Sequence, residues 1–152
     1  MGCVCPCEVL VNAVSENKNV KFLSSIGACR GNLTYLADVS AAALETSTLS
    51  FTFDNTEYPG FFDFLFTANT ITSIDCKREG RNCVVTVKGT GTVSKLPIPS
   101  FPLLFEAVFT DQASSEANDI VQSFVLTNFF DQNGVASVPQ GTIHARGCQE
   151  VK

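Results

Sequence analysis

Apolar and polar residues alternate with a period of two along much of the chain. In residues 49–53, for example, Leu49, Phe51 and Phe53 fall on one face, and serine and threonine fall on the other. Successive side chains of a β-strand point to opposite faces of its sheet, so this period predicts strands buried on one side. Similar segments between turn residues predict strands over residues 20–28, 33–38, 47–53, 61–67, 70–76, 83–94, 103–110, 120–129 and 141–146.

Turn residues separate these segments, and Pro59-Gly60 and Asn133-Gly134 are the clearest signals. Gly89 and Gly91 share one face of the segment 83–94 and predict a bulge or a close backbone approach within that strand. A helical turn is expected over residues 39–45, which contain three consecutive alanines but are too few for a stable isolated helix.

Many short strands in one chain predict an all-β fold. We expect an antiparallel β-sandwich of the jelly-roll type, with an up-and-down barrel as the alternative. Residues 1–18 carry three cysteines and then a polar stretch, so they are expected to form an N-terminal connector arm, in which residues 8–14 can add to a sheet. The β-sandwich domain is then expected over residues 19–152.

The composition permits a large core and a weakly charged surface. Of the 152 residues 45% are apolar, and 13 are phenylalanine, so burial can stabilise the domain without a metal or cofactor. Charged residues amount to 16%, below the roughly 25% of an average domain, which protects the surface poorly against association. The net charge of −5 and the lack of a basic stripe argue against nucleic acid as a partner.

The N-terminus does not have the pattern of a secretory signal, which needs a basic region followed by an apolar run. No run of 18 or more apolar residues is present, so no membrane span is expected. The start Met1-Gly2-Cys3 invites a lipidation reading, but Pro6 stands where myristoylation prefers serine or threonine. Any extracellular use is therefore expected to follow release without a signal peptide.

Seven cysteines are the most informative residues of the chain: Cys3, Cys5, Cys7, Cys29, Cys76, Cys83 and Cys148. Structural zinc sites usually combine two C-x2-4-C pairs. Here the three arm cysteines are separated by single residues and the other four are isolated, so no metal site is expected.

Cys76 and Cys83 flank a predicted hairpin loop and differ from the others. A hairpin can bring two such residues within the Cα separation that a disulfide requires, which makes an intramolecular bond one reading. The other reading is two small buried side chains at strand ends. Five cysteines remain, and an odd number suggests intermolecular pairing or a free thiol.

A cysteine-bearing connector ahead of a β-domain resembles the subunits of bacterial endospore appendages, which are pilus-like fibres on spores of Bacillus-type bacteria. Cys3, Cys5 and Cys7 match the connector, Cys29 an early acceptor and Cys148 a late one. The resemblance implies jelly-roll subunits that stack by β-augmentation into a helical filament on the spore or cell surface. It also implies intermolecular disulfides from the connector to Cys29 and Cys148 of other copies. The chain departs from the family in its C-x-C-x-C spacing and its extra Cys76 and Cys83.

Catalytic and ion-binding readings are weaker. His144 could pair with Cys148 or Cys29 as base and nucleophile, but a lone strand histidine is more often an ordinary surface or packing residue. Asp111, Glu116 and Asp119 could bind calcium, but a solvated acidic loop is the simpler reading. We therefore expect a non-enzymatic, self-assembling subunit with no small-molecule substrate. The alternative is a monomeric jelly-roll module that binds a ligand or carbohydrate.

Overall fold

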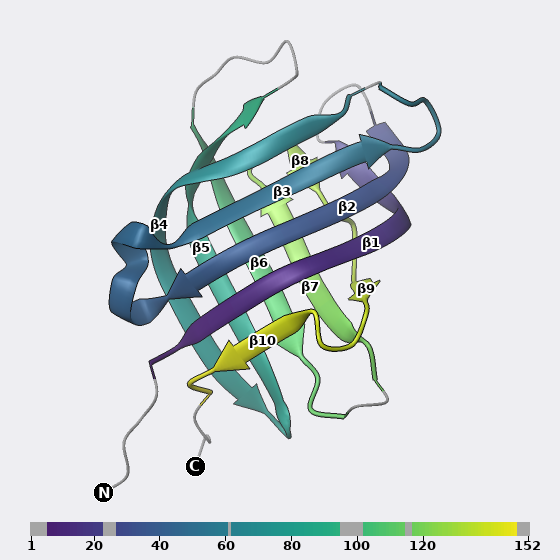
Figure 1. Cartoon of the computed structure of the whole chain (residues 1–152). Helices are drawn as coiled ribbons and strands as arrows, with labels where there is room; N and C mark the ends of the chain where they lie inside the picture. The colour runs from purple at the N-terminus through teal and green to yellow at the C-terminus, as the bar shows by residue number, and fades with distance from the viewer. Residues whose placement is uncertain (1–5, 23–26, 61, 95–101, 115–116, 149–152) are drawn as a thin grey trace, which may run out of the picture.

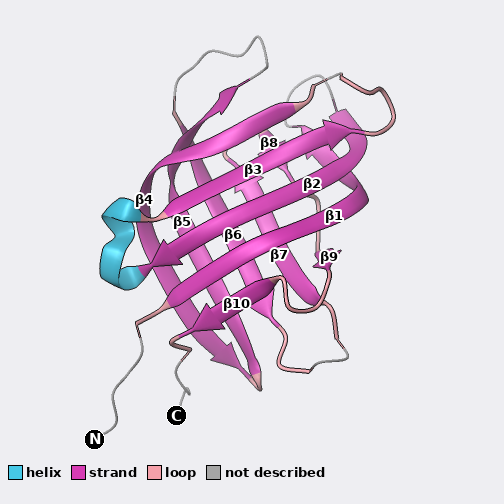
Figure 2. Ribbon diagram, viewed as in Figure 1, coloured by secondary structure: helices cyan, strands magenta, loops and turns pink. Residues whose placement is uncertain are grey.

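Antiparallel β-strands make up most of the molecule, as a computed structural model shows (Figures 1 and 2). The structure describes residues 6–22, 27–60, 62–94, 102–114 and 117–148. A short 3-10 helix, η1 (Ala41–Thr46), connects two of the strands and overlaps the expected helical turn. The strands are β1 (Glu8–Phe22), β2 (Gly27–Ser40), β3 (Thr48–Asn55), β4 (Phe64–Glu79), β5 (Asn82–Ser94), β6 (Leu103–Asp111), β7 (Asp119–Leu126), β8 (Phe130–Asp131), β9 (Ala136–Val138) and β10 (Ile143–Arg146).

The sheet closes on itself. From β1 to β8 each strand pairs with the next along the chain, and β8 returns to β1 through the Phe22–Phe130 pair. Three short strands share this closure: β8 pairs with the end of β1, β10 pairs with its start, and β9 pairs with β7. The result is an eight-stranded up-and-down barrel, with β9 and β10 added where β7 faces β1 (Figure 1).

The all-β antiparallel class predicted from the sequence is confirmed, but the jelly roll is not what the strands form. A jelly roll pairs strands that are distant along the chain, whereas here sequential strands pair throughout β1 to β8. The expected boundary at residue 18 also differs, because residues 8–18 belong to β1 and are part of the barrel. The two strands expected over residues 61–67 and 70–76 are one continuous strand, β4.

Aromatic rings fill the barrel interior. Phe51 and Phe124 stack with centroids 4.3 Å apart, and Phe22 meets four other rings edge-on. Burial of such rings is a large favourable contribution to folding. The alternation read from the sequence is confirmed here, since the apolar face of each strand points inward. The largest fully buried side chains are Tyr35, Phe22, Phe51, Phe53, Phe64, Phe66, Phe109, Phe124, Phe130, Leu33, Leu126 and Ile143.

Gly89 and Gly91 allow β5 to bend against β4. A Cβ on Gly91 would lie 2.5 Å from the ring of Phe66, and one on Gly89 would lie 2.8 Å from the ring of Phe105. The partner strand β4 has register shifts between Ala68 and Thr70 and between Ile71 and Ser73, directly across from these glycines. The close approach predicted from the sequence is therefore present, with the irregularities on the facing strand.

Candidate functional site

Four cysteines meet at one end of the barrel and form two neighbouring disulfides. Cys7 bonds to Cys76 with a Cα separation of 5.6 Å, and Cys83 bonds to Cys148 with a separation of 5.7 Å. Both separations fall in the range that disulfides require. The two bonds fasten the segment before β1 and the segment after β10 to the two strands of the β4–β5 hairpin. We call these four residues the cysteine cluster.

The predicted bond between Cys76 and Cys83 is wrong, and the strand register explains why. Cys76 pairs across the hairpin with Val85, while Cys83 pairs with Arg78. The two cysteines are thus offset by two residues and lie diagonally on one face instead of opposite each other. Each is left to bond with a cysteine from a chain end. The family resemblance also implies that Cys7 and Cys148 bond to other copies of the chain. In the structure each of them forms a disulfide within its own chain instead.

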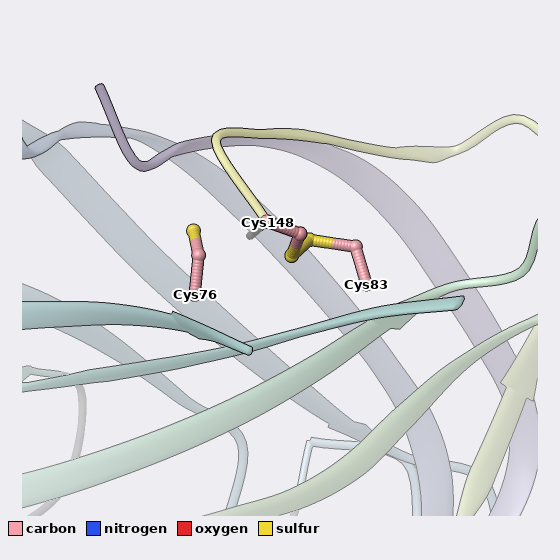
Figure 3. Close-up of side chains that lie close together, drawn as sticks. All are labelled: Cys76, Cys83 and Cys148. Atoms are coloured by element: carbon pink, nitrogen blue, oxygen red, sulfur yellow. A yellow bond between two sulfur atoms is a disulfide. The ribbon is translucent and has the colours of Figure 1, made fainter. Parts of the chain in front are cut away.

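The cluster is partly buried and close-packed. Cys76 and Cys83 pack against the hydrophobic core from the end of the barrel. The Sγ atoms of Cys76, Cys83 and Cys148 lie within 4.8 Å of one another, and Figure 3 shows the Cys83–Cys148 bond beside the sulfur of Cys76. Since Cys76 is bonded to Cys7, the two disulfides are neighbours. Sulfur atoms from four separate segments therefore occupy one small volume.

Backbone contacts hold the two chain ends at the cluster independently of the sulfur bonds. The N–H of Ala41 donates to the carbonyl oxygen of Cys7 at 2.8 Å, and Glu8 pairs with Arg146 in the β1–β10 ladder. Gly147 has a φ of +83°, and a Cβ there would lie 2.5 Å from the carbonyl oxygen of Pro6. Glycine is therefore needed immediately before Cys148, both for its backbone angle and for this close approach.

Two carboxylates position the last strand. Asp119 is fully buried; its Oδ2 accepts the N–H groups of Gly141 and Ile143, and its Oδ1 accepts that of Gln112. Asp111 accepts the N–H of Ala145 at 2.9 Å. Burial raises the pKa of Asp111, and the charge of Asp119 raises it further. The hydrogen bond from Ala145 and the interaction with His144 both act to lower this pKa. These residues anchor β10 rather than forming a solvated acidic loop, and Glu116 lies outside the described residues.

Cys29, a free thiol, lies near the other end of the barrel. It pairs across the β1–β2 ladder with Val20, at the opposite end of β1 from Cys7. With about 3.3 Å per strand residue, the two cysteines are separated by roughly 40 Å along β1. Cys29 is partly buried against the core, and burial raises the pKa of its thiol, with a further contribution from the negative charge of Glu57.

Cys3 and Cys5 lie outside the described residues. Chain connectivity alone limits where they can be: a fully extended chain spans at most about 3.6 Å per residue, so Cys3 lies within about 14 Å of Cys7.

The structure does not bring together the residues of the catalytic reading. His144 is exposed on β10 and pairs with Leu10, ten residues along β1 from the partner of Cys29. Cys148 is bonded to Cys83, and its sulfur therefore carries no nucleophilic thiol. A base and a nucleophile must lie within hydrogen-bond reach, and neither cysteine offers this to His144.

Sequence reasoning missed two buried polar residues that organise the interior. The sequence predicts a loop at Asp119, although this residue directly precedes an apolar segment. Gln132 is fully buried and accepts a hydrogen bond from the Tyr35 hydroxyl, while its Nε2 donates to the carbonyls of Val121 and Gly134. The turn predicted at Asn133-Gly134, beside Gln132, is present, and both residues have positive φ. Nothing local marked Gln132 itself as buried.

Comparisons of the chain with protein-family models, curated proteins and solved structures give no match. Within the described residues, no helix is long and apolar enough to cross a membrane.

Proposed function

We propose that this chain is a self-assembling structural subunit, in which cysteines before the barrel of one copy form disulfides with Cys29 of the next. The observation that carries the proposal is the position of Cys29. It is a free thiol near the barrel end opposite to the one where Cys7 is fastened. A donor and an acceptor at opposite ends of a subunit are the arrangement that head-to-tail linkage requires.

Geometry favours a link between copies over a link within one copy. Cys3 and Cys5 stay within about 14 Å of Cys7, whereas Cys29 is roughly 40 Å away along β1. Cys29 thus lies beside the far end of β1 from Cys7, which favours a bond from Cys3 or Cys5 to Cys29 of another copy over one within the same barrel. The same contact repeated between copies is heterologous, and a heterologous contact that does not close on itself gives a filament.

The outer surface of β1 and β2 supports close packing of copies. Leu10, Val14 and Leu36 are all exposed, and the ladder places Leu36 opposite Asn12, between the other two. Charged residues amount to only 16% of the chain, so little repulsion opposes contact between such surfaces. Stacking by β-augmentation is not part of the proposal, because a closed barrel uses its strand edges internally.

The resemblance to endospore appendage subunits is compatible with this proposal, which includes a location outside the cell or on a spore surface. Disulfides persist in oxidising surroundings, and two are formed at the cysteine cluster. A ligand-binding module has less support. Small barrels that hold a ligand do so in their interior, and aromatic rings occupy that space here.

Two complementary variants test the wiring. Cys29→Ser removes the thiol that receives the link and keeps Cys3 and Cys5. A Cys3→Ser/Cys5→Ser double variant keeps only Cys29 for links between copies. Wild-type protein, oxidised in air and run without reductant, is expected to give a ladder that thiol collapses to a monomer. Each variant alone is expected to stay monomeric. An equal mixture of the two is expected to give disulfide dimers, and trimers where Cys3 and Cys5 of one copy each bond to Cys29 of another, but no ladder of longer species. Dimers of Cys29→Ser alone, or a wild-type monomer in both lanes, would refute the proposal.

A further inference from the structure

The cysteine cluster places three sulfur atoms close enough together to share one metal ion, and a fourth is bonded to one of the three. The three, on Cys76, Cys83 and Cys148, lie within 4.8 Å of one another (Figure 3). The fourth, on Cys7, is bonded to that of Cys76. The oxidised chain uses all four in disulfides. Reduction would leave four thiols, on four segments of the chain, at the same end of the barrel.

We infer that the reduced chain binds one Zn²⁺ through the thiolates of Cys7, Cys76, Cys83 and Cys148. Structural zinc sites are tetrahedral and closed, and four thiolates are a common ligand set. A Zn–S distance of about 2.3 Å places the four sulfurs about 3.8 Å apart in a tetrahedron. The sulfurs of Cys76, Cys83 and Cys148 already lie within 4.8 Å of one another. Once reduced, the two sulfurs of each disulfide must move apart from about 2.05 Å to about 3.8 Å, and side-chain rotation can supply this movement.

The site is preorganised because its segments stay docked without the disulfides. The β1–β10 ladder, the hydrogen bond from Ala41 to Cys7 and the Asp119 carboxylate all hold the chain ends in place. The Sγ of Cys76 lies 3.4 Å from the carbonyl oxygen of Arg146, so its thiol has an acceptor in the reduced chain. Reduction therefore frees the ligands without dispersing them.

The surrounding charge favours such a centre. Four thiolates and one Zn²⁺ carry a net charge of −2. Lys77, Arg78 and Arg81 outnumber Glu79 at the hairpin tip. Arg146, in the last strand, is paired with Glu8. A concentration of positive charge stabilises thiolates. Sequence spacing concealed the site, since the hairpin pairs its two cysteines diagonally and each remaining ligand comes from a different chain end.

The two states exclude each other because they use the same sulfurs. Each disulfide is reduced by two electrons from two molecules of a thiol reductant, which become a disulfide while both cysteines gain a proton. Binding of Zn²⁺ by the four thiols then releases four protons. In reducing surroundings the metal would fasten both chain ends to the β4–β5 hairpin, and in oxidising surroundings the disulfides would do so.

Cobalt substitution tests the site directly. The full chain is reduced with a phosphine, freed of reductant without oxygen and titrated with Co²⁺ alone. One Co²⁺ per chain is expected, with the intense sulfur-to-cobalt charge-transfer bands and the visible bands of a tetrahedral four-thiolate centre. One equivalent of Zn²⁺ should abolish these bands. Absence of the bands at one equivalent, or their presence in the oxidised chain, would overturn the inference.

Variants separate this site from other thiols. Cys83→Ser is expected to lose the four-thiolate spectrum and to bind Zn²⁺ more than about 100-fold more weakly. Loss of a residue that only hydrogen-bonds to a metal ligand typically lowers metal affinity by about 10- to 100-fold, so this larger loss indicates a direct ligand. Cys29→Ser and Cys3→Ser/Cys5→Ser are the matched controls and should keep both spectrum and affinity. If Cys3→Ser/Cys5→Ser loses Zn²⁺ binding, Cys3 or Cys5 is a ligand, and the proposed set of four cysteines is refuted.

Folding provides an independent measurement. The near-ultraviolet circular dichroism of buried Tyr35 reports whether the reduced chain keeps its tertiary structure. Zn²⁺ is expected to raise the Tm of the reduced wild-type chain but not that of the oxidised chain or of reduced Cys83→Ser, since a ligand stabilises only the state that binds it. A reduced chain that gains no stability from Zn²⁺, or stays unfolded with it, would contradict the inference.

Discussion

The buried carboxylate of Asp119, at the start of β7, accepts the backbone N–H of Ile143, at the start of β10, with a distance of 3.0 Å. The same oxygen accepts the N–H of Gly141 at 2.9 Å, so one side chain fixes the turn and the strand that follows it. β10 leads directly to Cys148. The cysteine cluster therefore depends on an internal residue that is distant from it in sequence.

Replacement of Asp119 by asparagine should destabilise the barrel. The amide retains one acceptor oxygen but points a donor at backbone N–H groups, which leaves buried donors unpaired. We expect a loss of about 3 kcal/mol in the free energy of unfolding, measured with denaturant under oxidising conditions. Asp75→Asn, on an exposed position of β4, is the matched control and should stay within about 0.5 kcal/mol of wild type. Equal stability of both variants would refute the anchoring role.

Gly147→Ala should loosen the contact between the two chain ends. Its Cβ would lie 2.7 Å from the Cα of Cys7, and its φ of +83° is unfavourable for alanine. Gly80→Ala is the control, because its φ is also positive, at +62°, but its Cβ would meet open space. We expect a loss of about 1 kcal/mol in the control and about 1–3 kcal/mol more for Gly147→Ala, measured by thermal unfolding. A larger loss in Gly80→Ala would contradict this assignment.

Cys29 should react slowly with iodoacetamide at neutral pH. Burial and the charge of Glu57 raise the pKa of its thiol, and only the thiolate is the nucleophile. Glu57→Gln removes the second effect and should speed alkylation of the folded chain, followed by mass spectrometry, while Glu45→Gln should leave the rate unchanged. Faster alkylation at higher pH is expected in all three proteins. An unchanged rate in Glu57→Gln would show that Glu57 does not act on this thiol.

Asp111 should make the barrel more stable as the pH falls from neutral toward mildly acidic values. Burial raises the pKa of this carboxyl above 3.8, so the folded chain takes up the proton before the unfolded chain does. Stability from this group is therefore gained on acidification through the folded pKa and is complete below the unfolded value.

Asp111→Asn tests this pH dependence because it retains an oxygen acceptor for the Ala145 N–H and removes the charge. Its Tm should equal or exceed that of wild type at neutral pH, and the difference should shrink as the pH is lowered. A gap that grows on acidification would show that the pKa is lowered instead.

Local pattern determined much of the secondary structure. The two-residue period placed the inward side chains of the strands, such as Phe51 and Val87, because alternation is a property of each strand alone. Gly89 and Gly91 marked the close approach of β4, since no other residue fits beneath the rings of Phe66 and Phe105. Antiparallel pairing also followed, because short turns join most of the strands.

Closure and cysteine pairing were decided only by the tertiary structure. A sandwich and a barrel need the same alternation, and the choice rests on the contact of Phe22 with Phe130, more than 100 residues away along the chain. The two disulfides span 69 and 65 residues, and their partners follow from a strand register that no local signal specifies. Sequence determined which residues could face a core or form a bond. Long-range packing determined which of them meet, because that requires the whole barrel to close.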